Sequence, residues 1–186
     1  MKQPISKPFY ETERLWLILS HPSLSGAVTE YFIRNREFLQ ETEPFHTEEF
    51  FTLPYQEGDM KRAMEEAANN VGARFWLIPK ETPGIIIGMV ALNNIIWGSF
   101  RSCFLSYRLD KLEINRGYMT EAVKKCIEIA FRELKLHRLE ANVMPRNKPS
   151  RRVMEKLDFH YEGLALRYLY INGKWEDHMH LVKLNE

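Results

Sequence analysis

A short polar turn between a strand pattern and the clearest helical pattern of the chain restricts the possible folds most strongly. Residues 114–117 form the turn, and the amphipathic segment 118–134 follows it directly. Apolar residues recur in that segment at the spacing of one helix face, namely Met119, Ala122, Val123, Cys126, Ala130 and Leu134. Backbone N–H groups in the first turn of a helix have no helical partners and favour an anion. The segment therefore predicts a strand–turn–helix unit that can bind a phosphate where the helix begins.

Three residues of the turn suit this role. Gly117 has no Cβ, so the backbone can come close to a ligand. Asn115 tolerates the left-handed conformation that converging N–H groups often require, and Arg116 can add a charge-assisted contact. A plain helix start that contains a glycine is the alternative, because short glycine motifs often occur by chance. The dinucleotide-binding and Walker patterns are absent from the sequence.

A second polar helix start lies about 25 residues further along the chain, where Asn147 and Ser150 open the helical segment 147–157. Either side chain can cap that helix, which would explain its presence without a further role. In the functional interpretation, Asn147 binds an amide-bearing arm of a cofactor and Ser150 faces a reacting group. The two helix starts together favour a cofactor with phosphates at one end and chemistry at the other.

The remaining patterns predict one α+β domain over residues 1–186. Strands are expected over 13–19, 75–78, 85–92, 103–109, 139–144, 163–171 and 174–184. Helices are expected from a cap at Ser23 or Ser25 to residue 39, and over 59–70, 118–134 and 147–157. Turns at 82–84 and at Asn172-Gly173 predict two hairpins. The first half would then be antiparallel, and the second half would run strand–helix–strand–helix–strand.

Composition argues against several classes of function. A formal charge of +1 gives no general attraction to nucleic acids or anionic membranes. No apolar run approaches the roughly 20 residues of a membrane span, and residues 1–5 carry no signal-peptide pattern. Cys103 and Cys126 are expected to be buried thiols in a reducing compartment. The sequence therefore predicts a soluble cytoplasmic protein, whose basic cluster at 148–156 lies in solvent or beside the phosphates of a cofactor.

The chain resembles the GNAT acyltransferase superfamily, and within it the Rim-type ribosomal-protein N-terminal acetyltransferases. Residues 116–122 resemble the pyrophosphate loop and helix start of that branch, and residues 147–159 resemble its next helix and the strand that follows. The resemblance extends to the opening strand and the closing hairpin, at 12–15 and 172–177. The sequence departs from the family pattern in two places. Ile114-Asn115 replaces the usual start of the loop, and Asp158 replaces a glycine, so Asp158 is expected to adopt a left-handed conformation.

The resemblance implies a GNAT fold, in which a mixed, mostly antiparallel central sheet is flanked by helices and contains a splayed parallel strand pair, 103–109 and 139–144. Acetyl-CoA would lie between these strands as co-substrate, without a metal, and its pantetheine arm would pair with main chain near Leu109. The expected cofactor-binding residues are Leu109, Asn115, Arg116, Gly117, Tyr118, Met119, Thr120, Asn147 and Ser150. A primary amine would attack the thioester directly, and Ser150 would protonate the departing thiolate.

The sequence leaves open which group takes the proton from the amine. His178 and His180 share one face of the last expected strand. Glu41, Glu43 and His46 follow the first helix, where the family builds its acceptor site. Surface histidines and solvated loop charges are the plainer interpretation of each of these residues.

The resemblance favours the α-amine at a protein N-terminus as acceptor, with a small-molecule amine as the alternative. A protein that binds acyl-CoA without turnover is a further alternative, since a fold and a cleft do not establish activity. A nucleic-acid-binding module would need basic and aromatic residues clustered on one face and is not expected. The oligomeric state stays open between monomer and homodimer.

Overall fold

The computed structural model describes residue 5 and residues 7–186. Its strands are β1 (Phe9–Glu11), β2 (Leu15–Leu19), β3 (Ala73–Pro79), β4 (Gly88–Ile96), β5 (Ser102–Leu109), β6 (Arg138–Val143), β7 (His160–Ile171) and β8 (Lys174–Leu184). Its α-helices are α1 (Ser25–Gln40), α2 (Leu53–Ala68), α3 (Tyr118–Glu128) and α4 (Lys148–Lys156). Short 3-10 helices at Pro22–Leu24 and Glu48–Phe51 and a π-helical turn at Ile129–Glu133 complete the elements. The expectation about a signal peptide concerns a segment of which residues 1–4 lie outside the described part.

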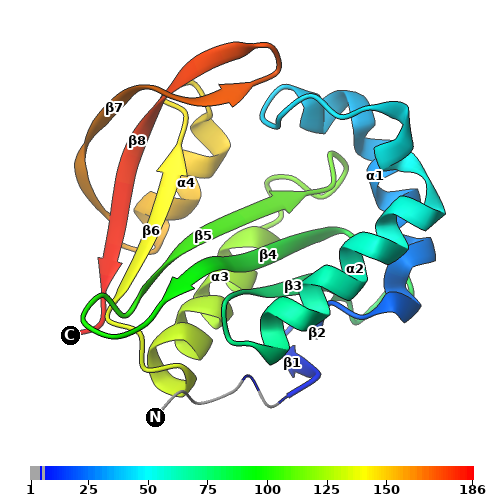
Figure 1. The fold of residues 1–186 in the computed structure, drawn as a ribbon, viewed down its shortest axis with the longest axis horizontal. Coiled ribbons are helices and arrows are strands. Elements are labelled where there is room, and N and C mark those ends of the chain that lie inside the picture. The colour runs from blue at the N-terminus through cyan, green and yellow to red at the C-terminus, as the bar shows by residue number, and fades with distance from the viewer. Residues whose placement is uncertain (1–4, 6) are drawn as a thin grey trace.

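The strands form one mixed sheet in the order β1-β2-β3-β4-β5-β6-β8-β7 (Figure 1). Within the described residues β5 and β6 are the one parallel pair, and every other neighbouring pair is antiparallel. α1 and α2 pack on one face of the sheet, and α3 and α4 pack on the other. This is an α+β fold, and the succession β5–α3–β6–α4–β7 confirms the predicted order of the second half.

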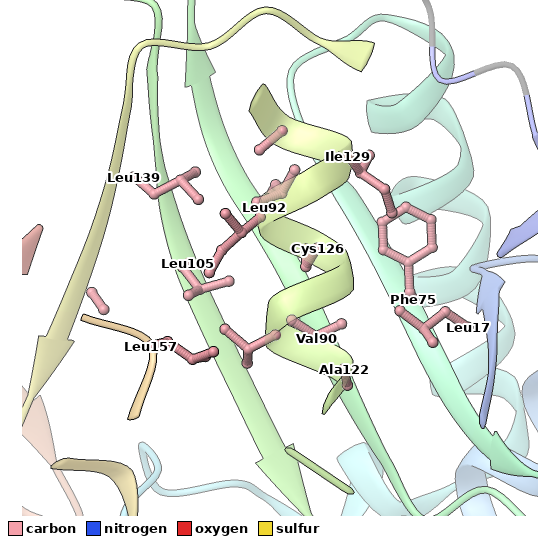
Figure 2. Packing of buried hydrophobic residues seen from close by; sticks show 14 of the residues in the cluster. Leu17, Phe75, Val90, Leu92, Leu105, Ala122, Cys126, Ile129, Leu139 and Leu157 are labelled. Atoms are coloured by element: carbon pink, nitrogen blue, oxygen red, sulfur yellow. The ribbon is translucent and has the colours of Figure 1, made fainter. Parts of the chain in front are cut away.

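Alternation along the strands gives each face of the sheet its own core. On β3, Phe75 packs toward α3, whereas its neighbour Trp76 packs toward α1 and α2. Figure 2 shows the α3 side, where Ala122 and Cys126 point at apolar residues of the strands. Every apolar position predicted for this helix face is buried. The two cores hold the sheet between its helices. The site lies along the strands β5 to β8.

The parallel pair separates soon after it forms. β5 and β6 are in register only at Ser102↔Arg138, Cys103↔Leu139 and Phe104↔Glu140. Beyond these positions the two strands diverge, and Figure 1 shows β5 and β6 pointing in different directions with the start of α4 near the opening. The backbone groups of β5 after Phe104 therefore have no partner on β6. The structure confirms the splayed strand pair.

The helix boundaries differ from the sequence-based expectations in three places. α2 begins at Leu53 rather than at Asp59, because Pro54 lies in the first turn, where its missing N–H removes no helical bond. The prediction that Ser23 or Ser25 caps α1 is wrong: the Ser25 hydroxyl donates to the Pro22 carbonyl oxygen, and no side chain caps α1. The segment expected as one helix over 118–134 changes from α-helix to a π-helical turn after Glu128.

The strand boundaries also shift by a few residues. β1 precedes the strand that was expected to be the first, and the strand expected over 85–92 occupies Gly88–Ile96. β7 begins at His160, three residues before the expected Gly163. Asn172 and Gly173 both have positive φ, 44° and 83°, as the predicted turn between β7 and β8 requires. Asp158 has a φ of 55°, which confirms its left-handed conformation.

No helix in the described part of the chain is long and apolar enough to cross a membrane. Cys103 and Cys126 are both buried free thiols, as expected.

Candidate active site

A cleft with a volume of about 580 Å³ opens where β5 and β6 separate. Its walls come from the second half of β5, the end of β6, the first turns of α4 and the turn before α3. Further walls come from the end of α1, the loop 41–44 and the inner side of the β7–β8 hairpin. The predicted cofactor-binding residues that line the cleft are Leu109, Asn115, Gly117, Met119, Thr120, Asn147 and Ser150. Of the candidate bases, Glu41, Glu43 and His178 line it, and His46 and His180 do not.

The turn before α3 presents its backbone N–H groups without internal partners. Asn115 and Gly117 both have positive φ, 63° and 82°, so the chain curls tightly into the helix. Gly117 is the N-cap and no side chain caps α3. The first helical bond runs from Glu121 N–H to the Gly117 carbonyl oxygen at 3.1 Å. Among the described residues none accepts from the N–H groups of 115–120, which leaves a cluster of donors suited to a phosphate.

Arg14, which is more than 100 residues away in sequence, holds this turn in place. Its Nε and Nη2 atoms lie 2.7 Å from Oε2 of Glu121, and its Nη1 donates to the Arg116 carbonyl oxygen at 2.9 Å. The guanidinium also lies over the ring of Tyr118, 4.5 Å from its centroid. Burial alone would raise the pKa of Glu121, but hydrogen bonds from Thr12 and Arg14 outweigh it and keep the pKa below its usual value. One ion pair thus joins the start of β2 to the first turn of α3.

The side chains of Arg116 and Tyr118 do not line the cleft. Arg116 pairs with Glu113 at 3.1 Å, and the Tyr118 hydroxyl donates to Glu81 at 2.9 Å. The charge-assisted contact expected from Arg116 would therefore need that side chain to leave Glu113. The two residues contribute their backbone N–H groups to the turn instead.

Asp110 fixes the approach to the same turn from the α1 side. The residue is 3 % exposed. Its Oδ2 atom accepts from Arg34 Nε at 2.6 Å and from Asn35 Nδ2 at 3.0 Å. Oδ1 accepts from the Leu112 N–H at 3.0 Å. Burial would raise the pKa of Asp110, but the hydrogen bonds from Asn35, Leu112 and Arg34 outweigh it and hold the pKa below its usual range. The carboxylate thus anchors the end of β5 and the chain that leads to the turn before α3.

A pair of hydroxyl groups lies where α4 meets β5. Ser150 Oγ is 2.7 Å from the Tyr107 hydroxyl oxygen, and both residues line the cleft. Burial raises the pKa of Tyr107 to about 12. Asn147 caps α4, because its Oδ1 accepts the Ser150 N–H at 3.1 Å. The cap accounts for the side-chain oxygen of Asn147 and leaves its amide N–H groups for a ligand.

The opposite side of the cleft carries charged groups. Arg108 follows Tyr107 on β5 and therefore points to the other face of the sheet, where it lies 2.9 Å from Glu43. Glu43 is only 8 % exposed and also lies 3.2 Å from Nε2 of His46. Hydroxyl groups thus face the cleft from the α4 side, and ion pairs face it from the α1 side.

An arch of hydrogen bonds closes this end of the cleft. The Asn172 N–H donates to the Glu43 carbonyl oxygen at 3.2 Å, so the hairpin tip touches the loop after α1. Figure 1 shows that tip beside the end of α1. Arg146 donates to the Glu41 carbonyl oxygen at 3.1 Å and to Oε1 of Glu176 at 3.0 Å.

His178 lines the cleft beside this arch, and its residue exposure is 3 %. Its Nδ1 lies 3.0 Å from the Glu176 carbonyl oxygen. Tyr168 lies next to both His178 and His180, with ring centroids 5.8 and 5.0 Å apart, which confirms that the two histidines share a face. The described residues contain no group of three or more His, Cys, Asp or Glu side chains that could hold a metal ion.

Sequence reasoning missed several functional side chains, namely Arg14, Tyr107, Arg108 and Arg146. Tyr107 and Arg108 belong to a strand whose alternation was visible, but the alternation does not say which face meets α4. Arg14 and Arg146 act through contacts with residues about 30 to more than 100 positions away. Only the fold brings these partners together.

Comparison with known proteins points to one family. Residues 17–160 match the family model of the acetyltransferase (GNAT) domain. A probable N-acetyltransferase, YjcK of Bacillus subtilis, is 40 % identical over 151 residues, which cover 81 % of this chain and 83 % of that protein. The crystal structure of the ribosomal-protein-S5-alanine acetyltransferase of Vibrio fischeri is 34 % identical, with a TM-score of 0.92 over 97 % of this chain and 98 % of that one. Mycobacterium smegmatis RimJ, solved in complex with CoA-disulfide, shares the fold at 22 % identity, with a TM-score of 0.91 over 99 % of this chain and 90 % of that one.

Proposed function

The chain belongs to the GNAT acetyltransferase family, and on that premise we propose that it transfers the acetyl group of acetyl-CoA to the α-amine at the N-terminus of a protein chain. Residues 1–186 would act as one catalytic domain in the cytoplasm. The observation that carries the proposal is the continuous cleft that joins a turn of free N–H groups to the Tyr107–Ser150 hydroxyl pair. A phosphate site at one end and a proton donor further along the same cleft fit a thioester cofactor with a phosphate-bearing tail.

The proposed position of acetyl-CoA follows from the donors that line the cleft. Its pyrophosphate would accept from the N–H groups of 115–120, supported by the positive end of α3. Arg152 and Lys156 line the cleft on α4 and would lie near the adenosine phosphate. The pantetheine amides would pair with the main chain of β5 near Leu109, where the sheet has lost its next strand. The CoA derivative bound to the M. smegmatis neighbour supports this cofactor for the fold.

The transfer is a direct displacement in this proposal. The neutral amine nitrogen attacks the thioester carbonyl carbon, the new C–N bond forms, and the C–S bond breaks. The sulfur leaves as a thiolate and takes a proton from the Ser150 hydroxyl. Tyr107, 2.7 Å away, returns a proton to Ser150 and later regains one from solvent. Because the pKa of Tyr107 is about 12, its hydroxyl is protonated at neutral pH and is ready to donate.

The choice of a protein N-terminus rests on the acceptor side of the cleft and on one relative. The loop 41–44 and the inner side of the β7–β8 hairpin border this end of the cleft, and the end of an extended chain would enter between them. The V. fischeri relative, 34 % identical, is named for the alanine of a ribosomal protein. A small-molecule amine is the second candidate, since the mixed charges at this end set no requirement for a long acceptor.

The test offers the purified protein acetyl-CoA with three acceptors: a short peptide that begins with alanine, the same peptide with a blocked α-amine and an internal lysine, and spermidine. Thiol release and a mass increase of one acetyl group are followed together, with Ser150→Ala as control. The proposal expects modification of the free α-amine only. Modification of spermidine alone would favour the small-molecule alternative. Acetyl-CoA binding without transfer to any acceptor would contradict catalysis.

A further inference from the structure

We infer that His178 is the general base that removes the proton from the attacking amine. The inference deepens the proposed function and rests on it. It starts from the position of His178 on β8, where the side chain lines the acceptor end of the cleft and is almost inaccessible from outside. A base must lie within hydrogen-bond reach of the amine, and this end of the cleft is where the amine would meet the thioester.

Glu43 and Glu176 at this end form ion pairs, whereas Glu41, which also lines the cleft, forms none among the described residues. Glu43 lies 2.9 Å from Arg108 and 3.2 Å from His46. Glu176 lies 3.0 Å from Arg146 and 3.1 Å from Lys174, and hydrogen bonds from these two residues keep its pKa below the usual range. A carboxylate stabilised in this way as an anion has little tendency to accept a proton near neutral pH. The carboxylate of Glu176 therefore does not suit the role of base, and that of Glu43 is already shared between Arg108 and His46.

By contrast, His178 is neutral and has a ring nitrogen that can accept a proton. The Glu176 carbonyl oxygen, 3.0 Å from Nδ1, can only accept a hydrogen bond, so Nδ1 carries the proton. In the neutral ring Nε2 then has a free lone pair. Burial lowers the pKa of His178 below its ordinary value, so the ring is neutral at neutral pH. The hydrogen bond fixes both the tautomer and the orientation of the ring.

Among the described residues, no group around His178 forms a hydrogen bond to its Nε2 atom. On its own strand the neighbours are Glu176 and His180, with Asp177 on the opposite face, where its carboxylate accepts from the Arg167 N–H. From β7 the uncharged ring of Tyr168 lies beside it. From the loop after α1, Glu43 also lines the cleft, and it is paired as described above. None of these residues makes a hydrogen bond to Nε2 of His178.

Two unpaired polar atoms on the same face support a ligand at this place. Asn142 on β6 stands directly opposite His180 on β8. The side-chain oxygen of Asn142 and Nε2 of His180 are both buried and have no hydrogen-bond partner in the described structure. Buried polar atoms are nearly always satisfied in a working protein. Asn142 lines the cleft, so a bound amine or its water would satisfy its oxygen, whereas His180 lies outside the cleft lining.

The amine proton passes to His178 and from there to solvent. As the C–N bond forms, the proton on the amine nitrogen moves to Nε2 of His178. The resulting imidazolium donates from Nδ1 to the Glu176 carbonyl, which stabilises the charged ring. The proton passes to solvent after the acetylated product leaves. The acid that serves the thiolate, Ser150, lies on the other side of the cleft and takes no part in this transfer.

The experiment measures kcat/KM against pH for the alanine peptide, in the wild type first and then in His178→Gln. The wild type is expected to lose activity below the pKa of His178, and the variant is expected to lose about 100-fold in kcat/KM and to lack that acid limb. The matched control is His160→Gln, an exposed histidine on β7 outside the cleft, which should keep the full rate. Calorimetric titration should show unchanged acetyl-CoA binding in His178→Gln.

Two further variants, His178→Ala and Glu43→Gln, also test the inference. Added imidazole should restore activity to His178→Ala, and Glu43→Gln should keep the acid limb even if its KM for the peptide rises. Full activity of His178→Gln, or an acid limb that vanishes in Glu43→Gln, would overturn the inference. Failure of the wild type to modify any amine is a separate result, because it would overturn the proposed function itself.

Discussion

The hydroxyl oxygens of Tyr107 on β5 and Ser150 on α4 lie 2.7 Å apart, and this contact joins the two elements that border the cleft. The Tyr107 hydroxyl also lies 3.2 Å from the Ser150 carbonyl oxygen. Tyr107 therefore positions the start of α4 as well as the hydroxyl group. The pair thus serves the proposed proton transfer and also holds α4 against β5.

Ser150→Ala should lower kcat by about 30-fold, because the thiolate loses its proton donor. Tyr107→Phe should lower kcat by about 10-fold, since Ser150 remains but cannot be reprotonated as readily. The double variant should be little slower than Ser150→Ala, because the two hydroxyl groups act in series. Steady-state kinetics with the alanine peptide measures all three. Fully multiplicative losses would show that the two hydroxyl groups act independently.

Arg14→Ala should weaken acetyl-CoA binding by about 5- to 10-fold, because the turn that carries the N–H groups loses its brace. The side chain of Arg14 is 42 % exposed, so its ion pair with Glu121 adds little to global stability, and the melting temperature should barely change. Arg14→Ala combined with Glu121→Gln should cost no more than either change alone. Arg62→Ala, which breaks an ion pair on α2, is the control and should leave binding unchanged.

Asp110 should make stability fall in acid. Its pKa is lower in the folded state than in the unfolded chain, so its contribution is complete above the unfolded value and is lost as the pH falls through the folded value, below about pH 4. Asp110→Asn should lower the melting temperature at neutral pH by about 5 °C, which corresponds to about 2 kcal/mol. Thermal unfolding at several pH values checks both points. A variant that loses stability in acid as steeply as the wild type would contradict this assignment.

Arg146→Ala should act on the acceptor and spare the cofactor. The change removes the hydrogen bonds from Arg146 to the Glu41 carbonyl and to Glu176, so one side of the arch loosens. The KM for the alanine peptide should rise about 5-fold, and the KM for acetyl-CoA should stay the same. Arg132→Ala on the π-helical turn serves as control. An equal rise in both KM values would show that the arch also shapes the cofactor site.

Much of the fold followed from sequence because it depends on local signals. The apolar face of 118–134 and the Asn172-Gly173 turn each specify an element without reference to the rest of the chain. The left-handed conformation of Asp158 was expected from the family resemblance, in which a glycine occupies this position, and the structure confirms it. Boundaries failed where tertiary packing overrides a local signal, as at α2, where packing extends the helix back through Gly58 to Pro54.

The candidate site was predictable only in part, because its contacts are not local. The candidate phosphate-binding turn was predictable from Gly117 and from the helical pattern that follows it. By contrast, the ion pairs of Glu43 with Arg108 and of Glu176 with Arg146 link different elements of the fold. The tautomer of His178 depends on one carbonyl oxygen two residues away, and only the observed backbone places that oxygen beside Nδ1.

The most direct measurement is calorimetric titration of the wild type and of Gly117→Glu with acetyl-CoA. Gly117 has a φ of 82° at the centre of the turn, so a glutamate there would strain the backbone and place a negative charge among the N–H groups. Gly26→Glu, at an exposed position with open space around it, controls for the added charge. The account predicts binding in the micromolar range for the wild type and Gly26→Glu, and none for a folded Gly117→Glu. A wild type that does not bind acetyl-CoA, or a Gly117→Glu variant that binds it equally well, would contradict the account.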